Sequence, residues 1–264
     1  MKKLILLKIG GGVITNKNVH YGLREDVLTR LAKEIGEANK ELVDTDVIVG
    51  NGAGSFAHFS AAKYRTTEGF VDENSSVGLG WVRHDAVKLN QIVLEQLLLA
   101  DCPAFSFAPS SFISVENGKT KTVFMDSIVD ALDKKLIPLV YGDPMIDAQK
   151  GCDIYSTEKV FDELAKYFVD KREVRVIHVS SEEGVYKKGQ ASVFEEIDSD
   201  NFEEVRTHLG GSHGVDVSGG MLHKVQECLE LTKFGIVSQI VSGMVPNRVR
   251  DAIIGKKAKG TTIK

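Results

Sequence analysis

The sequence has 264 residues, of which 42% are hydrophobic and 27% charged, with 25 glycines and only 5 prolines. This composition is typical of a globular protein and excludes an intrinsically disordered chain. The formal net charge of −4 argues against a dedicated nucleic-acid binder and against a protein that binds membranes through positive charge.

The first apolar run spans four residues before Lys8, which is shorter than the apolar region of a signal peptide. No segment approaches the roughly 18 uninterrupted apolar residues of a membrane helix. The cysteines, Cys102, Cys152 and Cys228, are far apart and odd in number, so they predict neither a disulfide framework nor a zinc site. We therefore expect a cytoplasmic protein with no membrane contact, no nucleic-acid partner and no metal site of its own.

Short apolar runs alternate with longer stretches of helical period along the chain. This alternation predicts an α/β protein with a central, mostly parallel sheet covered by helices on both faces, a three-layer αβα sandwich in a single domain over residues 1–264. The predicted strands are 4–9, 46–49, 104–107, 137–141, 174–179, 238–241 and 260–263. The predicted helices are 24–40, 76–100, 126–134, 157–169, 201–208, 218–234 and 247–254. Between them, Asn117 and Gly118 form a strong hairpin-turn signal.

The predicted helix 76–100 carries an apolar stripe that widens toward its end through Ile92, Leu94, Leu98 and Leu99. Such a helix lies either in the centre of a core or at an interface between two copies of the chain, and the sequence leaves both readings open. We expect a homodimer.

The first candidate functional segment follows the first strand, where three glycines are flanked by Lys8 and Lys17. Glycine lets backbone N–H groups approach an anion without interference from a Cβ atom, and the two lysines can place positive charge on the same anion. A plain turn is the alternative, because neither of the common nucleotide-binding glycine motifs is present.

The second segment follows the strand predicted at 46–49, where Gly50, Gly52 and Gly54 precede a helix that starts near Ser55. The N-terminus of a helix favours anions through its unpaired N–H groups and its dipole. His58 falls in the first turn of that helix, where it can donate a hydrogen bond to a phosphate oxygen. A lone histidine is otherwise more often structural.

Two further segments lie in the second half of the chain. Asp143 follows a strand end, where it either starts a turn or holds the lysines in place. Gly219 and Gly220 precede a helix that carries Lys224 in its first turns. This lysine is either solvated or neutralises the charge on a phosphoryl group during transfer.

These four segments, in this order and over nearly the whole chain, resemble the amino acid kinase superfamily, and within it the isopentenyl phosphate kinases. The GAGSFGH segment of those kinases is similar to residues 52–58 here, and the histidine that binds the acceptor phosphate falls on His58. The resemblance implies ATP-dependent phosphorylation of isopentenyl phosphate by direct in-line transfer, with Mg²⁺ arriving on ATP. It implies an acceptor-binding part over about 1–145 and a nucleotide-binding part over about 146–264.

The same resemblance implies the site residues. The expected catalytic residues are Lys8, Lys17, His58, Asp143 and Lys224. The expected acceptor-binding residues are Gly11, Gly12, Ala53, Gly54, Ser55, His58 and Gly142. The expected nucleotide-binding residues are Lys8, Gly10, Lys17, Ser180, Gly184, Tyr186, Gly219, Gly220 and Lys224. An apolar substrate tail needs an apolar wall, which we expect by chain position at Phe70, Val77, Met145 and Ile146.

The sequence departs from the family pattern on the expected nucleotide side. Ser156-Thr157-Glu158 stands in place of SGD, and residues 180–184 read SSEEG in place of TDVDG, so that Glu158 and Glu183 keep an acidic group with one more methylene. These changes leave open a non-catalytic ATP-binding regulatory module. A kinase for another small phosphate or phosphonate such as fosfomycin also stays open, because the resemblance implies that the related fosfomycin kinases share the histidine at the position of His58.

Overall fold

The computed structural model describes residues 1–209 and 220–264. In this part of the chain, an eight-stranded sheet has the order β10-β12-β11-β9-β1-β2-β6-β3. Only the pairing of β11 with β12 is antiparallel within this sheet, so the prediction of a mostly parallel sheet is confirmed. The strands are β1 (Lys3–Ile9), β2 (Thr45–Asn51), β3 (Ala104–Ser106), β6 (Ile137–Tyr141), β9 (Glu173–Ser180), β10 (Glu196–Ile197), β11 (Val237–Ser242) and β12 (Gly260–Ile263).

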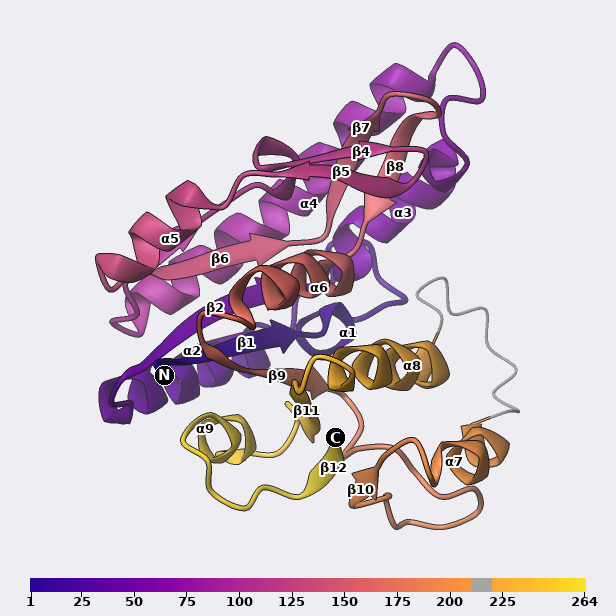
Figure 1. Ribbon diagram of the computed structural model, residues 1–264. Helices are drawn as coiled ribbons and strands as arrows, with labels where there is room; N and C mark the ends of the chain where they lie inside the picture. The colour runs from indigo at the N-terminus through magenta and orange to yellow at the C-terminus, as the bar shows by residue number, and fades with distance from the viewer. Residues whose placement is uncertain (210–219) are drawn as a thin grey trace.

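Helices cover both faces of this sheet, as Figure 1 shows. Alternate residues of β1 point to opposite faces: Ile5 and Leu7 belong to one core, whereas Leu4 and Leu6 belong to the other. The first core is closed by α2 (Glu25–Glu41), α4 (Ser75–Leu99) and α9 (Arg248–Ile253). The second is closed by α5 (Asp126–Asp133) and α6 (Thr157–Phe168). The expected three-layer sandwich is therefore confirmed.

The C-terminal strands are covered by two further helices, α7 (Phe202–Leu209) and α8 (Gly220–Thr232). Val205 of α7 and Val225 of α8 share a buried cluster with Ile240 of β11 and Ile263 of β12. The predicted start of α8 at residue 218 lies outside the described residues. Two short helices, α1 (Gly11–Ile14) and α3 (Gly54–Tyr64), begin directly after β1 and β2, and one-turn 3₁₀ helices occupy Thr66–Glu68 and Pro109–Ser111.

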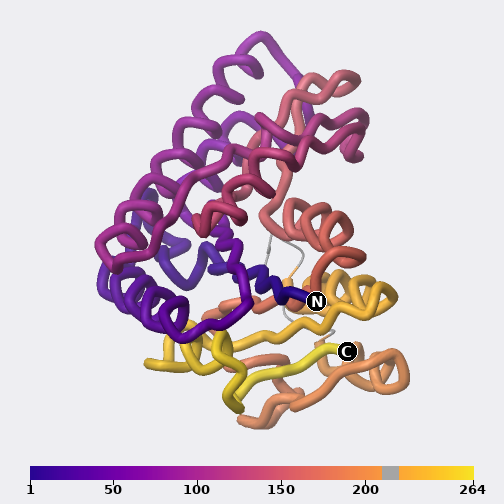
Figure 2. The backbone as a smooth tube through the Cα atoms, turned by 60° about the vertical axis from the view of Figure 1, so that its left-hand side comes forward, coloured from indigo at the N-terminus to yellow at the C-terminus, as the bar shows by residue number. Residues whose placement is uncertain are grey.

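A second, four-stranded sheet lies beside the N-terminal half of α4, in the upper part of Figure 1 and Figure 2. Its order is β5 (Lys119–Val123), β4 (Ile113–Glu116), β7 (Asp143–Asp147) and β8 (Gly151–Tyr155). The hairpin expected at Asn117 and Gly118 joins β4 to β5, and both residues have the positive φ that such a turn requires.

Strands β7 and β8 were not expected, since the sequence predicts only a turn after β6. The reason is that β7 starts with Asp143 and Pro144, two residues that are depleted in strands. Contacts across the chain stabilise it instead: the carboxylate of Asp147 accepts hydrogen bonds from the backbone of Asn117, at 3.0 Å, and Gly118, at 2.7 Å. These bonds attach the β7–β8 hairpin to the β4–β5 turn.

The described residues contain no helix with both the length and the apolar character needed to cross a membrane.

Candidate active site

The candidate site lies where the parallel strands β1, β2, β6 and β9 end. In the sheet register, Lys8 near the end of β1 lies beside Gly50 of β2 on one side and His178 of β9 on the other. The two glycine loops that follow β1 and β2 are in direct contact: a Cβ atom on Gly52 would lie 2.8 Å from the backbone nitrogen of Gly11. The close approach of the loops thus requires glycine. Ligands of open α/β sheets bind at this edge.

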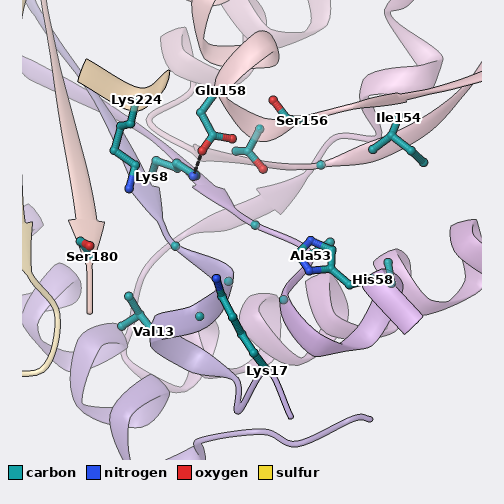
Figure 3. Close-up of a pocket in the computed structure, with 18 of the residues that line it drawn as sticks. Lys8, Val13, Lys17, Ala53, His58, Ile154, Ser156, Glu158, Ser180 and Lys224 are labelled. Carbon is teal, nitrogen blue, oxygen red and sulfur yellow. Dashed lines mark hydrogen bonds and ion pairs between the residues drawn. The ribbon is translucent and has the colours of Figure 1, made fainter. Parts of the chain in front are cut away.

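A cavity of about 370 Å³ opens at this edge. Figure 3 shows the side chains of Lys8, Lys17, His58 and Lys224 around it, from four separate segments of the chain. The expected site residues that line the cavity are Lys8, Gly10, Gly11, Gly12, Lys17, Ala53, Gly54, His58, Gly142, Ser180, Gly220 and Lys224. Gly219 lies outside the described residues. The structure thus brings most of the expected residues together.

Lys8 is only 7% exposed, and its ammonium group forms an ion pair with Glu158 in the first turn of α6. Burial alone would raise the pKa of Glu158, but the charge and hydrogen bond of Lys8 outweigh burial and lower this pKa to about 2. Glu158 is therefore ionised at neutral pH. The side chain of Ser156 caps the same helix by accepting a hydrogen bond from the backbone nitrogen of Lys159, at 3.2 Å.

Asp143 does not have the expected role. It is fully buried, forms an ion pair with Arg83 of α4, and accepts a hydrogen bond from the backbone nitrogen of Ser110, at 2.9 Å. The expectation that Asp143 holds the lysines is therefore wrong, and among the described carboxylates Glu158 is the one paired with Lys8. The sequence signal for Glu158 was the acidic residue kept in the Ser156-Thr157-Glu158 segment.

The apolar wall of the cavity also differs from expectation. It is formed by Ala57 and Ala61 of α3, Val82 and Ala86 of α4, Pro144 of β7 and Ile154 of β8. Pro144 and Ile154 are directly paired between the two strands.

None of the four residues expected in this wall lines the cavity. Met145 is buried on the opposite face of β7 from Pro144, because successive strand residues alternate between faces. Ile146 lies farther along the strand and is 79% exposed, while Phe70 and Val77 are also exposed. Ser55 is buried beside the first loop, where its backbone nitrogen donates a hydrogen bond to the hydroxyl of Thr15, at 3.0 Å.

On the other side of the cavity, Ser181 and Glu182 join Ser180, and Met221 and Glu227 of α8 join Lys224. Burial and the nearby charge of Glu158 raise the pKa of Glu227 above its ordinary value. Sequence reasoning missed Glu227, for which a glutamate on an amphipathic helix gives no distinctive signal.

Gly184 and Tyr186 do not line the cavity, although both were expected to bind nucleotide. A Cβ atom on Gly184 would meet the hydroxyl of Thr261 at 2.6 Å, so this glycine packs against β12. Tyr186 forms an isolated β-bridge with Val193. The carboxylate of Glu183 forms an ion pair with Lys259.

His178 lies behind Lys8 and was not expected. Its Nε2 atom lies 3.4 Å from the Sγ atom of Cys228. Burial and the positive charges of Lys8 and Lys224 lower the pKa of His178 to about 3, so the ring is neutral at physiological pH. His178 therefore fills space beside Lys8 without adding a further charge.

Among residues 1–209 and 220–264, no group of three or more histidine, cysteine, aspartate or glutamate side chains could hold a metal ion. The described lining of the cavity combines glycine loops with ammonium and imidazole side chains, which suits an anion. It also holds the carboxylates of Glu158, Glu182 and Glu227, of which Glu158 is paired with Lys8. Fold and site together define an α/β protein whose cavity, at the ends of parallel strands, has the residue types that suit an anion.

Comparison with known proteins identifies the family. The sequence model of the amino acid kinase family matches residues 3–242, so this chain belongs to that family. The chain is 31% identical to the isopentenyl phosphate kinase of Methanothermobacter thermautotrophicus and 29% identical to that of Methanocaldococcus jannaschii, and each alignment covers 98% of both chains.

Solved structures agree with this assignment. A structure of an isopentenyl phosphate kinase superimposes with a TM-score of 0.81 at 28% sequence identity, over 98% of this chain and 100% of the other. The structure of an isopentenyl phosphate kinase substrate complex gives a TM-score of 0.75 at 21% identity, over 98% of this chain and 100% of the other, and supports the fold alone.

Proposed function

We propose that this protein is an ATP-dependent kinase that transfers the γ-phosphoryl group to the phosphate of isopentenyl phosphate, giving isopentenyl diphosphate and ADP. The observation that carries the proposal is one cavity that joins two glycine loops, three lysine side chains and a histidine to an apolar wall. A phosphorylated molecule with a short apolar tail matches both halves of this cavity. Two relatives that cover 98% of this chain bear the name isopentenyl phosphate kinase.

The proposed mechanism needs charge stabilisation and no general base. A phosphomonoester has a second pKa of about 6, so the acceptor is already an anion near neutral pH. His58 would donate a hydrogen bond to the acceptor phosphate, and Lys8, Lys17 and Lys224 would neutralise the charge on the transferring group. Glu158 would hold the ammonium group of Lys8 in place.

The apolar wall would bind the substrate tail. The side chains of Ala57, Ala61 and Ala86 are small, and their position leaves room beside the glycine loops for an apolar group. Burial of such a tail is favourable by about 25 cal/mol for each Å² removed from water. This wall belongs to α3, α4, β7 and β8, so the acceptor-binding part would extend from the N-terminal half to about residue 155.

The nucleotide would bind on the opposite side, at Gly10, Ser180, Gly220 and Lys224. Mg²⁺ would be held mainly by the phosphates of ATP, because the described residues contain no group of three or more histidine, cysteine, aspartate or glutamate side chains that could hold the ion. Ser181 and Glu182 of the same rim lie where they would meet the nucleotide.

The test is ADP release measured with isopentenyl phosphate, dimethylallyl phosphate and fosfomycin as separate acceptors. Turnover with isopentenyl phosphate at the highest kcat/KM is the expected result. Turnover with fosfomycin alone would overturn the substrate but keep phosphoryl transfer. ATP binding without ADP release for any of these acceptors would favour a non-catalytic regulatory module.

Two further proposals concern the whole protein. We infer a cytoplasmic location, supported by three free and buried cysteines, which fractionation of cells would test. We also infer a homodimer, because Leu98, Leu99 and Phe105 are exposed where α4 ends and the edge strand β3 begins.

A further inference from the structure

The loop that carries Lys17 has a strained residue at Tyr21. The loop runs from α1 to α2 and is closed by a hydrogen bond from the backbone nitrogen of Asn16 to the carbonyl of Gly22, at 2.6 Å. Tyr21 has a φ of 57°, in the left-handed region. This conformation is uncommon for a bulky side chain, and it persists only where surrounding contacts hold it.

The contact that holds Tyr21 comes from helix α4. The hydroxyl of Tyr21 donates a hydrogen bond of 2.6 Å to the carboxylate of Asp85, which is only 1% exposed. The ammonium group of Lys88, one turn farther along α4, lies 3.9 Å above the ring of Tyr21. The ring also meets the edge of Phe56 in α3, at a centroid distance of 5.1 Å. Tyr21 is thus fixed at both its hydroxyl and its ring.

Asp85 has a full set of partners for a buried carboxylate. The Nδ1 atom of His84 lies 2.9 Å from the oxygen that accepts from Tyr21, and the Nε2 atom of His20 lies 3.9 Å from the other oxygen. Burial alone would raise the pKa of Asp85, but hydrogen bonds from Tyr21, His84 and Ser60 outweigh burial and lower it. Asp85 therefore remains an anion that accepts the hydroxyl of Tyr21.

This anchor connects the two parts of the site. Val82 and Ala86, on either side of Asp85 in α4, line the apolar wall of the cavity. At the other end of the anchor, the side chain of Lys17 lies across the first glycine loop, with its Cε atom 3.0 Å from the position of a Cβ on Gly12. The contact between Tyr21 and Asp85 therefore links the apolar wall, which would bind the acceptor, to Lys17, which would meet the phosphoryl group.

We infer that Tyr21 and Asp85 are positioning residues that hold the Lys17 loop against α4, so that Lys17 is placed for phosphoryl transfer. This inference rests on the proposed kinase activity. Positioning matters for such a reaction, because a displacement of about 1 Å in a charge-stabilising group can cost a hundredfold in rate.

The test is a double-mutant cycle between Tyr21 and Lys17. Tyr21→Phe removes only the hydroxyl, and we expect kcat to fall about tenfold, while Lys17→Met causes a larger loss by itself. In the Lys17→Met background, Tyr21→Phe should change kcat by less than about twofold, because its effect acts through the lysine. Independent effects that multiply would overturn the inference.

Tyr167→Phe is the matched control. Tyr167 is half-buried at the opposite end of α6 from Glu158, does not line the cavity, and also has a lysine, Lys171, over its ring at 3.4 Å. This variant should keep the wild-type kcat. At Asp85, the Asp85→Asn variant keeps an acceptor oxygen for Tyr21 and should retain more activity than Asp85→Ala. Equal losses in the two Asp85 variants would contradict the hydrogen-bond role.

Hydrogen exchange gives a readout that does not need turnover. The amides of Asn16, Val19 and Gly22 are hydrogen-bonded within the loop and should exchange faster in Tyr21→Phe, while amides of the central sheet should not change. Unchanged exchange in the loop would overturn the anchor even if the enzyme is active. A wild-type protein inactive with every acceptor would overturn the proposed function, and the exchange experiment would still decide whether the anchor exists.

Discussion

Lys8 is a buried cation whose partner, Glu158, is a partly buried anion. Taking both groups out of water is costly, and their attraction repays this cost only while both are charged. Glu158 stays charged because the charge and hydrogen bond of Lys8 lower its pKa to about 2, against the effect of burial. The pair therefore fixes the position of Lys8 over the whole neutral pH range, and its loss should be visible in stability as well as in activity.

Glu158→Gln should lower the free energy of unfolding by about 3 kcal/mol at pH 7, since it leaves Lys8 buried without its anionic partner. A carboxyl with a depressed folded-state pKa stabilises the protein above its unfolded-state pKa, near 4.3, and this contribution disappears as the pH falls toward 2. The difference between wild type and variant in urea unfolding should therefore shrink between pH 5 and pH 3. A constant difference across this range would contradict the pairing.

His58 lies in α3 directly after the second glycine loop, at the boundary between the glycine loops and the apolar wall. If it donates a preorganised hydrogen bond to the acceptor phosphate, His58→Ala should lower kcat by at least ~10²-fold. His58→Gln keeps a donor and should lose less. Steady-state kinetics with isopentenyl phosphate measures both variants, and near-wild-type turnover of His58→Ala would remove this residue from the mechanism.

Among the elements, α9 is too short to be stable as an isolated helix. Its first turn is held by the carboxylate of Glu34 in α2, which accepts hydrogen bonds from the backbone nitrogens of Asn247, at 2.9 Å, and Val249, at 3.2 Å. The same carboxylate pairs with Arg30, at 2.6 Å. Glu34 thus replaces an ordinary side-chain cap with a contact across more than 200 residues of sequence.

Glu34→Ala should destabilise the protein by about 2 to 4 kcal/mol, since it leaves buried donors of α9 unsatisfied. Glu37→Ala, on the exposed side of the same helix, is the matched control and should change the free energy of unfolding by no more than about 0.5 kcal/mol. Urea unfolding of both variants measures the difference. Equal effects would show that Glu34 contributes no more than a surface charge.

At the scale of the molecule, the wide apolar stripe of α4 is divided between residues that pack in the core and residues that stay exposed. Ile92 and Leu94 pack against the core of the sheet, which agrees with a central core helix. Leu98 and Leu99 remain exposed, and Leu99 is 74% exposed. Phe105, on the edge strand β3, is 54% exposed, and it points away from α4 because its neighbours Ala104 and Ser106 face that helix. Edge strands and apolar patches are where copies of a chain associate.

If this surface forms the proposed homodimer, the double variant Leu99→Glu with Phe105→Glu should be monomeric, because each copy would have to bury two charges. Light scattering after size-exclusion chromatography measures the mass of both proteins. The double variant Phe70→Glu with Val77→Glu, at exposed apolar positions elsewhere, is the control and should remain dimeric. A monomeric wild type would contradict the prediction.

The sequence alone determined the layers of the fold and the general place of the site. The spacing of apolar residues and the length of each apolar run distinguished helices from strands, since buried parallel strands are continuous apolar runs and helices have an apolar stripe. The site was indicated by the glycines after β1 and β2 and by four side chains near loops, and these line the cavity: Lys8, Lys17, His58 and Lys224. These are local signals, because each depends on neighbours in the chain.

Only the tertiary structure decided which distant side chains meet. Asp143 and Glu158 both follow strand ends, yet the first faces Arg83 and the second faces Lys8. In β7 a step of one residue separates Pro144, in the cavity wall, from Met145, in the core. Tyr21 and Asp85 meet across 64 residues of sequence. Strand register, face and contact between separate elements are properties of the packed chain, and chain position alone does not encode them.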